Sequence, residues 1–361
     1  MDAAGIELPA ETRRALLRLV IRPSRVATVA VIVVVALLAV AGLSIPVWVQ
    51  AIPLAASLLL FGLPHGAMDH LVVGRLTGWP MGWLSLGLIV AAYLLLTGSY
   101  LALWAVAPVL AFGLFIALTW YHWGQGDLQM LLAVDGPGVL PTRRQRGLTL
   151  VVRGGLPMLV PLLAAPGIYH DVMDASVGVF GPGAHHGADW LFDERTRLVA
   201  GVVFAAIVVV TLIVTRPDAE PAHRRAWKMS VADTVLLAIA FAVVPPVLAI
   251  GIYFCCWHAT RHIARVILLG SPAPTITGSE WVVPAVGRFA REAALPTTGA
   301  LVLLAGLYIL APAASDEPLG LTGLYLVGLA VLTLPHTLVV TWLDWRQGVW
   351  SPSTGGPIRT D

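Results

Sequence analysis

The chain alternates between long runs of apolar residues and short polar segments. The apolar runs cover residues 27–43, 46–63, 82–105, 107–124, 147–166, 197–215, 232–270, 293–312 and 320–343. Most are close to the length of about 20 residues that a helix needs to cross a bilayer. Only helices and closed barrels satisfy their backbone hydrogen bonds in lipid. The pattern therefore predicts an all-α integral membrane protein, a bundle of about ten transmembrane helices, with eight to ten as the range.

The run over residues 232–270 is too long for one ordinary crossing. Pro245 and Pro246 interrupt it, and proline removes a backbone donor and clashes with the preceding turn of a helix. The run is therefore either one long kinked helix or two helices joined at the prolines.

Charged residues indicate the orientation in the membrane, because short loops rich in Lys and Arg stay on the cytoplasmic side. The N-terminus and residues 142–146 and 224–228 are basic, whereas residues 316–320 are acidic. Ten crossings with both termini inside satisfy this distribution, and they require two crossings between 232 and 270. We expect a cytoplasmic basic arm (1–25), a single polytopic transmembrane domain (26–345) and a cytoplasmic tail (346–361) in a multi-pass protein of the cell (inner) membrane.

Composition supports the membrane assignment. Hydrophobic residues make up 58% of the 361 residues and charged residues only 12%, against roughly a quarter charged in soluble proteins. The net charge of +2 is too small to indicate a nucleic-acid partner. Cys255 and Cys256 are adjacent in an apolar run, where neither a disulfide nor a Cys-rich metal site is expected. The expected partner is the lipid bilayer.

Five histidines lie at one expected depth. With ten crossings, His65 and His122 lie at the inner ends of the second and fourth, His258 and His262 in the inner half of the eighth, and His336 in the inner part of the tenth. Nine crossings would move His258 and His262 to the opposite side. Ionisable groups are costly in hydrocarbon and usually have a function there, so this convergence indicates a shared site.

Several imidazoles gathered at one site can bind a metal ion together. His258 and His262 are four residues apart and therefore share a helix face. Imidazole ligates iron, copper, zinc or nickel, and bundles build metal sites from ligands on facing helices. The expected ligands are His65, His122, His258 and His262. Taken alone, a single histidine such as His122 is more commonly a hydrogen-bonded core residue, and an isolated HxxxH pair also occurs by chance on many helices. For His336 three interpretations stay open: a fifth ligand, a neighbour of the ligands or core packing.

Other polar and aromatic side chains near these histidines have two interpretations. Asp69 and Asp127 are the nearest acceptors in sequence for the second ring nitrogen of a ligand, or they are solvated helix ends. Tyr121, Trp123 and Trp257 form part of an interfacial aromatic belt or the wall of a substrate tunnel.

The polar segment over residues 167–196 is expected outside. It contains His170, His185 and His186 among acidic residues, and a solvated loop is the simplest interpretation. Its role stays open.

Three motifs carry a resemblance to a known family. They are GLPHGAMDH at 62–70, YHWGQGD at 121–127 and WHATRH at 257–262. In this order on a chain with many spans, they resemble the Brp/Blh family, the bacterial and archaeal membrane β-carotene 15,15′-dioxygenases associated with retinal supply for rhodopsins. The resemblance covers residues from about 55 to 345.

The resemblance implies a non-haem iron oxygenase. A Fe(2+) ion bound by His65, His122, His258 and His262 would act in cleaving the central 15,15′ double bond of β-carotene with O2, giving two molecules of all-trans-retinal. A retinal-binding rhodopsin is the implied functional partner. The sequence leaves open the range of carotenoid substrates, the oligomeric state and whether the chain is active or a paralogue with another role.

Two other function classes are considered. A histidine-rich membrane desaturase or hydroxylase needs several HxxxH and HxxHH boxes, and this chain has one HxxxH and no HxxHH beside an apolar run. A metal- or proton-coupled transporter often has an inverted repeat, and the two halves of the sequence are not similar. Metal content and product analysis distinguish these classes from a carotenoid-cleaving enzyme.

Overall fold

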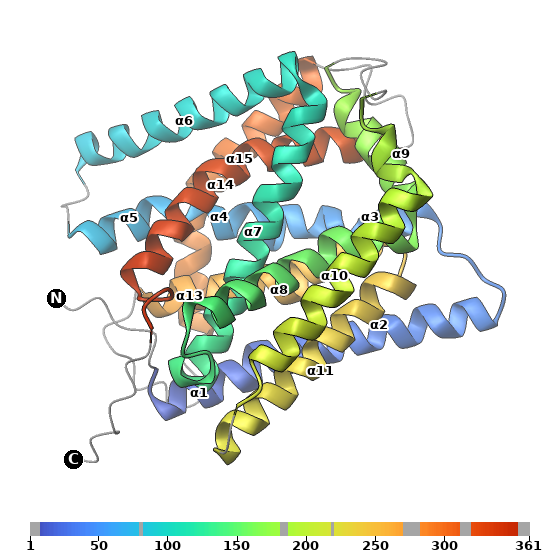
Figure 1. Ribbon diagram of the computed structural model, residues 1–361. Helices are drawn as coiled ribbons and strands as arrows, with labels where there is room; N and C mark the ends of the chain where they lie inside the picture. Colours follow the sequence, from blue (N-terminus) through green and yellow to red (C-terminus); the bar gives the residue numbers. More distant parts are fainter. Residues whose placement is uncertain are drawn as a thin grey trace.

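The computed structural model describes residues 8–78, 82–180, 187–217, 220–269, 282–310 and 319–352. Every regular element within these ranges is helical, and they contain no strand (Figure 1). The elements are α1 (Ala10–Leu16), η1 (Leu17–Ile21), α2 (Arg22–Val40), α3 (Val47–Ser57), η2 (Leu58–Gly62), α4 (Leu63–Ala67), α5 (Asp69–Thr77), α6 (Trp83–Val106), α7 (Pro108–Asp135), η3 (Pro137–Val139), α8 (Arg143–Ala164), α9 (Pro166–Val177), η5 (Asp189–Phe192), α10 (Glu194–Val214), α11 (Pro221–Val243), α12 (Pro246–Ile252), η6 (Tyr253–Ala259), α13 (Thr260–Leu269), α14 (Val282–Leu310) and α15 (Gly320–Arg346). The prediction of an all-α protein is confirmed.

Eight helical stretches in the described part of the chain are long and apolar enough to cross a membrane. They are Ala10–Val40, Val47–Thr77, Trp83–Val106, Arg143–Ala164, Glu194–Val214, Pro221–Val243, Val282–Ile309 and Gly320–Arg346. Two more long stretches, α7 and the continuous segment α12–η6–α13, are not among them. Both carry many buried polar residues. The number of spans agrees with the expected range, and the count of ten crossings stays a prediction.

The long run over residues 232–270 forms two helices. Helix α11 ends at Val243, Val244 has extended backbone angles, and α12 begins at Pro246. Proline is well tolerated at the first position of a helix, where its missing N–H has no helical partner. Of the two alternatives for this run, the structure therefore has two helices joined at the prolines.

The N-terminal helix begins earlier than the first apolar run. Segments α1, η1 and α2 form one continuous stretch from Ala10 to Val40. Leu16 and Ile21 pack against Val134 of α7, and Arg25 donates to Asp233 of α11 at 2.6 and 2.9 Å. Much of the predicted arm (1–25) is thus part of the helical body, and its cytoplasmic location stays a prediction.

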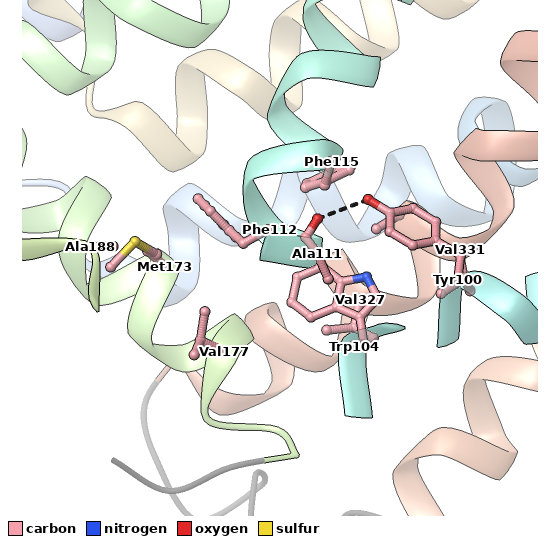
Figure 2. Close-up of a cluster of buried hydrophobic side chains, with 11 residues drawn as sticks. Tyr100, Trp104, Ala111, Phe112, Phe115, Met173, Val177, Ala188, Val327 and Val331 are labelled. Carbon is pink, nitrogen blue, oxygen red and sulfur yellow. Dashed lines mark hydrogen bonds between the residues drawn. The ribbon is translucent and has the colours of Figure 1, made fainter. Parts of the chain in front are cut away.

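Helix α7 runs through the middle of the molecule (Figure 1). Its backbone lies very close to that of α8, because a Cβ at Gly154 would collide with the carbonyl of Trp120. Small residues allow this close approach between membrane helices. At the other end of α7, Figure 2 shows Phe112 and Phe115 among buried side chains that include Trp104 of α6. The Tyr100 hydroxyl donates to the carbonyl of Ala111 at 2.9 Å. These contacts fix the helix that carries His122.

Candidate metal centre

Five histidines from separate parts of the chain meet inside the helical body. They are His65 of α4, His122 of α7, His258 of η6, His262 of α13 and His336 of α15. Each is at most 6% exposed. The structure thus brings together the five histidines that the sequence placed at one depth, and His336 has ring contacts with His65, His122 and His262.

Two π-helical turns position part of the cluster. Segment η2 leads into α4, where Pro64 lies in the first turn and the Phe61 carbonyl is 3.1 Å from Nδ1 of His65. Segment η6 itself carries His258. A π-helical turn departs from the regular hydrogen-bond pattern and is frequently found at functional sites.

The distances between the rings are those of a compact site. Nε2 of His258 lies 3.1 Å from Nε2 of His122. The ring centroid of His336 lies 4.9, 4.7 and 5.0 Å from those of His65, His122 and His262. One ring nitrogen from each of His65, His122 and His336 lies within 4.8 Å of the others. The same holds for ligand atoms of Asp69, His262 and His336.

The arrangement fits a bound metal ion. With metal–nitrogen bonds of about 2.0–2.1 Å, imidazoles on one ion have ring centroids roughly 4.5 Å apart when adjacent and roughly 6.5 Å apart when opposite. The centroids of His65 and His122 are 6.5 Å apart, and those of His122 and His258 are 4.8 Å apart. Nε2 of His262 and Nε2 of His336 are buried without a hydrogen-bond partner. Buried polar atoms normally have partners, so an ion would satisfy them.

Asp69 accepts a hydrogen bond from a histidine of the cluster. Its Oδ2 atom lies 2.8 Å from Nδ1 of His336, and the Tyr93 hydroxyl of α6 donates to the same oxygen. A carboxylate in this position fixes the ring orientation and turns the other nitrogen toward a metal. Asp69 was expected beside a ligand, but Tyr93 was missed, since a single tyrosine in an apolar run carries no sequence signal.

Asp127 has a different environment from the one expected. Trp257 Nε1 donates to it at 2.8 Å, and its carboxylate oxygens lie 3.5 and 3.6 Å from the guanidinium groups of Arg153 and Arg261. The Arg261 guanidinium also lies 4.0 Å from the centre of the Trp257 ring. In the described structure these contacts join α7, α8, η6 and α13, and they do not orient an imidazole.

A second buried ion pair was missed from the sequence. Arg265 of α13 donates to Asp344 of α15 at 2.6 Å, and both side chains are buried. Gln125 of α7 donates to the same carboxylate at 3.0 Å. Arg265 follows His262 by one turn, and Gln125 follows His122 by one turn. The pair therefore connects three of the helices that carry the cluster.

Aromatic side chains surround the imidazoles on one side. The Trp123 ring lies 5.7 Å from that of His258, and Phe254 lies 5.6 Å from His65. Tyr121 packs against a separate apolar cluster that contains Leu128 and Leu132. Of the three aromatic residues named from the sequence, Trp123 lies against the cluster and Trp257 one layer away.

The remaining histidines of the described residues lie apart from the cluster. His70 has its Nδ1 atom 2.9 Å from the carbonyl of Ala67. His170 of α9 is 3.1 Å from Asp174 and is partly exposed. His185 and His186 are outside the described residues.

Comparison with known proteins gives the family. The family described as beta-carotene 15,15′-dioxygenase matches residues 56–344. The chain belongs to the β-carotene 15,15′-dioxygenase family. The resemblance inferred from the three motifs is thereby confirmed.

Curated relatives from this family come from Halobacterium salinarum. The chain is 42% identical over 350 residues to a probable beta-carotene 15,15′-dioxygenase Blh of strain NRC-1, with 97% of this chain and 100% of the relative covered. It is 31% identical over 323 residues to a probable beta-carotene 15,15′-dioxygenase Brp of strain R1, with 86% and 88% covered. No solved structure matches the chain.

Proposed function

We propose that the protein is a non-haem iron oxygenase that cleaves the central 15,15′ double bond of β-carotene with O2 and releases two molecules of all-trans-retinal. Membership of the β-carotene 15,15′-dioxygenase family supports this assignment. The observation that carries it is the buried cluster of imidazoles, in which Nε2 of His262 and Nε2 of His336 lack hydrogen-bond partners. An iron site inside a membrane protein suits a substrate that dissolves only in lipid.

The residues proposed to hold the iron are His65, His122, His258 and His262, with His336 as a further ligand. All-imidazole ligation is compatible with iron, although zinc, copper and nickel also bind imidazole. When bound, the iron supplies a Lewis-acidic centre with a position for O2. The remaining chemistry depends on how the chain surrounds this centre.

Several side chains have supporting roles in the proposed site. Asp69 keeps the proton of His336 on Nδ1, so that Nε2 is free to bind. Phe254 and Trp123 cover the imidazoles and exclude water from the reacting bond. The hydrogen bond from Trp257 to Asp127 holds the turn that carries His258.

The overall reaction balances without a co-substrate. The central carbon–carbon double bond breaks, and each of its two carbons receives one atom of O2. Two identical aldehydes form, and no external reductant is consumed. The site therefore needs an open metal position and an apolar surrounding, but it does not need a residue that transfers protons.

The expected setting follows from this reaction. The substrate would reach the site from the bilayer of the cell (inner) membrane, and the retinal formed could serve a retinal-binding rhodopsin.

Co-expression in a cell that makes β-carotene tests the proposal. Chromatography should show loss of carotene and formation of retinal, with two retinals per carotene consumed. The purified protein should contain about one iron per chain, as a single closed cluster of ligands implies. His258→Ala should lose both the iron and the retinal. Unequal apocarotenals, or bound zinc with no retinal formed after Fe(II) is supplied, would contradict the proposal.

A further inference from the structure

A cavity of about 480 Å3 lies beside the histidine cluster. Its walls come from the N-terminal helix, η2 and α4, α13 and α14, and they include Leu19, Leu60, Phe61, Pro64, Ile263 and Phe289. No charged side chain and no histidine of the described chain lines it. Thr260, one of three threonines in the wall, donates its hydroxyl to the Cys256 carbonyl at 3.0 Å, so this hydroxyl is satisfied within its own helix.

The cavity adjoins the cluster through two segments of chain. Pro64 directly precedes His65, and the carbonyl oxygen of Phe61 is 3.1 Å from Nδ1 of His65. Ile263 follows His262 directly. A molecule in the cavity would therefore lie against the backbones that carry two of the imidazoles.

The backbone around the cavity is unusual. Segments η1 and η2 are π-helical and both contribute lining residues, Leu19 and Leu60 among them. The third π-helix of the described chain, η6, carries His258. Such turns are rare and concentrate at functional sites. Their gathering at the cavity and the cluster indicates that the two belong to one functional unit.

The cavity lies behind a helix that faces lipid. Helix α14 is a candidate span, and its Val283 and Leu295 are 78% and 81% exposed. Ala290, Ala293 and Ala294 of this helix line the cavity. The small side chains leave space next to the bilayer, from which an apolar molecule could arrive without crossing water.

We propose that this cavity binds one arm of an elongated isoprenoid polyene while the central double bond of the polyene lies at the histidine cluster. The proposal rests on the proposed function. A bond that is far from both ends of a long molecule reaches a buried site only if an arm of that molecule has an apolar space beside the site. The volume falls in the range of about 300–1,000 Å3 that is typical of small-molecule sites.

The test fills the cavity without touching the histidines. Ala290→Trp should lower the rate of retinal formation from β-carotene roughly tenfold or more, because a bulky side chain occupies the volume that the arm needs. Iron content should equal that of the wild type. An apocarotenal with one shortened arm should be cleaved with a much smaller loss, since its short arm fits the reduced space.

Matched variants and a second readout complete the experiment. Ala91→Trp on the exposed side of α6 should change neither iron content nor activity. β-Carotene in detergent should bind to the wild type with a shift of its visible absorption, and this shift should weaken in Ala290→Trp. If Ala290→Trp loses iron, the graded series Ala290→Val, Ala290→Leu and Ala290→Phe takes its place, and activity should fall with side-chain volume at constant iron.

Two failures are distinguishable. A wild-type protein that binds iron but makes no retinal from β-carotene overturns the proposed function. An active wild type whose Ala290 variants keep full activity, full carotene binding and normal iron overturns only the role of the cavity.

Discussion

His336 has the surroundings of a metal ligand. Asp69 holds its Nδ1 atom, and its Nε2 atom faces the other imidazoles without a hydrogen-bond partner in the described structure. No other histidine of the cluster has a carboxylate on its second nitrogen there; His65 has the carbonyl of Phe61 instead. Because carboxylate–histidine pairs commonly support metal ligands, His336 is the cluster residue whose orientation is fixed most strongly.

Iron binding should report this role directly. His336→Ala should remove the iron together with the activity. Asp69→Asn should keep the ligands but weaken iron binding by about 10–100-fold, the usual effect of losing such a supporting partner. Titration of metal-free protein with Fe(II), followed by elemental analysis, measures both. His70→Ala is the control, since that ring is directed to the carbonyl of Ala67. Normal iron binding by His336→Ala would show that His336 only packs beside the ion.

At the scale of single residues, some members of the candidate site could be predicted from the sequence and others could not. Five histidines could be grouped because span counting gave them one depth, and the structure brings them together. Their ligation of iron stays a prediction. His336 could not be ranked above core packing, because its pairing with Asp69 joins residues 267 positions apart. Tyr93, Arg265 and Asp344 had no signal at all, since local sequence does not record which distant helix a buried polar group faces.

The helices that carry the cluster are joined by buried charges. Arg265 of α13 and Asp344 of α15 are 3% and 0% exposed in their side chains. Removing one partner leaves an uncompensated buried charge, which costs more than the pair contributes. The ion pair between α13 and α15 thus maintains the spacing between His262 and His336, whose ring centroids are 5.0 Å apart.

Breaking this pair should lower the free energy of unfolding strongly. Arg265→Met alone should cost about 3–5 kcal/mol, and adding Asp344→Leu should recover part of the loss because no charge is left unpaired. Thermal unfolding in detergent measures the difference. Glu292→Gln serves as the comparison, because its pair with Arg75 is 3.5 Å long and partly exposed and should be worth less than about 1 kcal/mol. Equal effects of Arg265→Met and Glu292→Gln would refute the role of the buried pair.

The helices themselves were more predictable than their polar contacts. Apolar runs of membrane length give the spans, and Pro245 and Pro246 give the break between α11 and α12, because both effects are local. The start of the first helix was placed too late. Residues 10–25 are rich in arginine, and their helical state depends on packing against α7 that the sequence does not reveal.

The ends of the helices lie on two opposite faces of the molecule. Leu269 at the end of α13 packs near Leu76 at the end of α5, and Arg265 reaches Gln347 just after α15. Gln145 at the start of α8 donates to the carbonyl of Val214 at the end of α10 at 2.9 Å. In Figure 1, α1, α13 and the C-terminal end of α15 lie toward the left of the helical body. At the opposite face, α9 packs against the beginning of α15.

This grouping predicts the topology of the chain in the membrane. Arg143 and Arg146 of the basic segment over residues 142–146 donate to the carbonyls of Trp350 and Val349, just after α15. The face with the ends of α5, α13 and α15 therefore carries this basic segment and should be cytoplasmic. A reporter fused directly after Leu269 should therefore report the cytoplasm, because α11 and α12–η6–α13 would cross in opposite directions. A fusion after Val177, at the end of α9, should report the outside and serves as the control. A fusion after Leu269 that also reports the outside would show that the segment from Pro246 to Leu269 does not cross the membrane. The site could then not be built from two bilayer-spanning helices, α7 with His122 and α13 with His262.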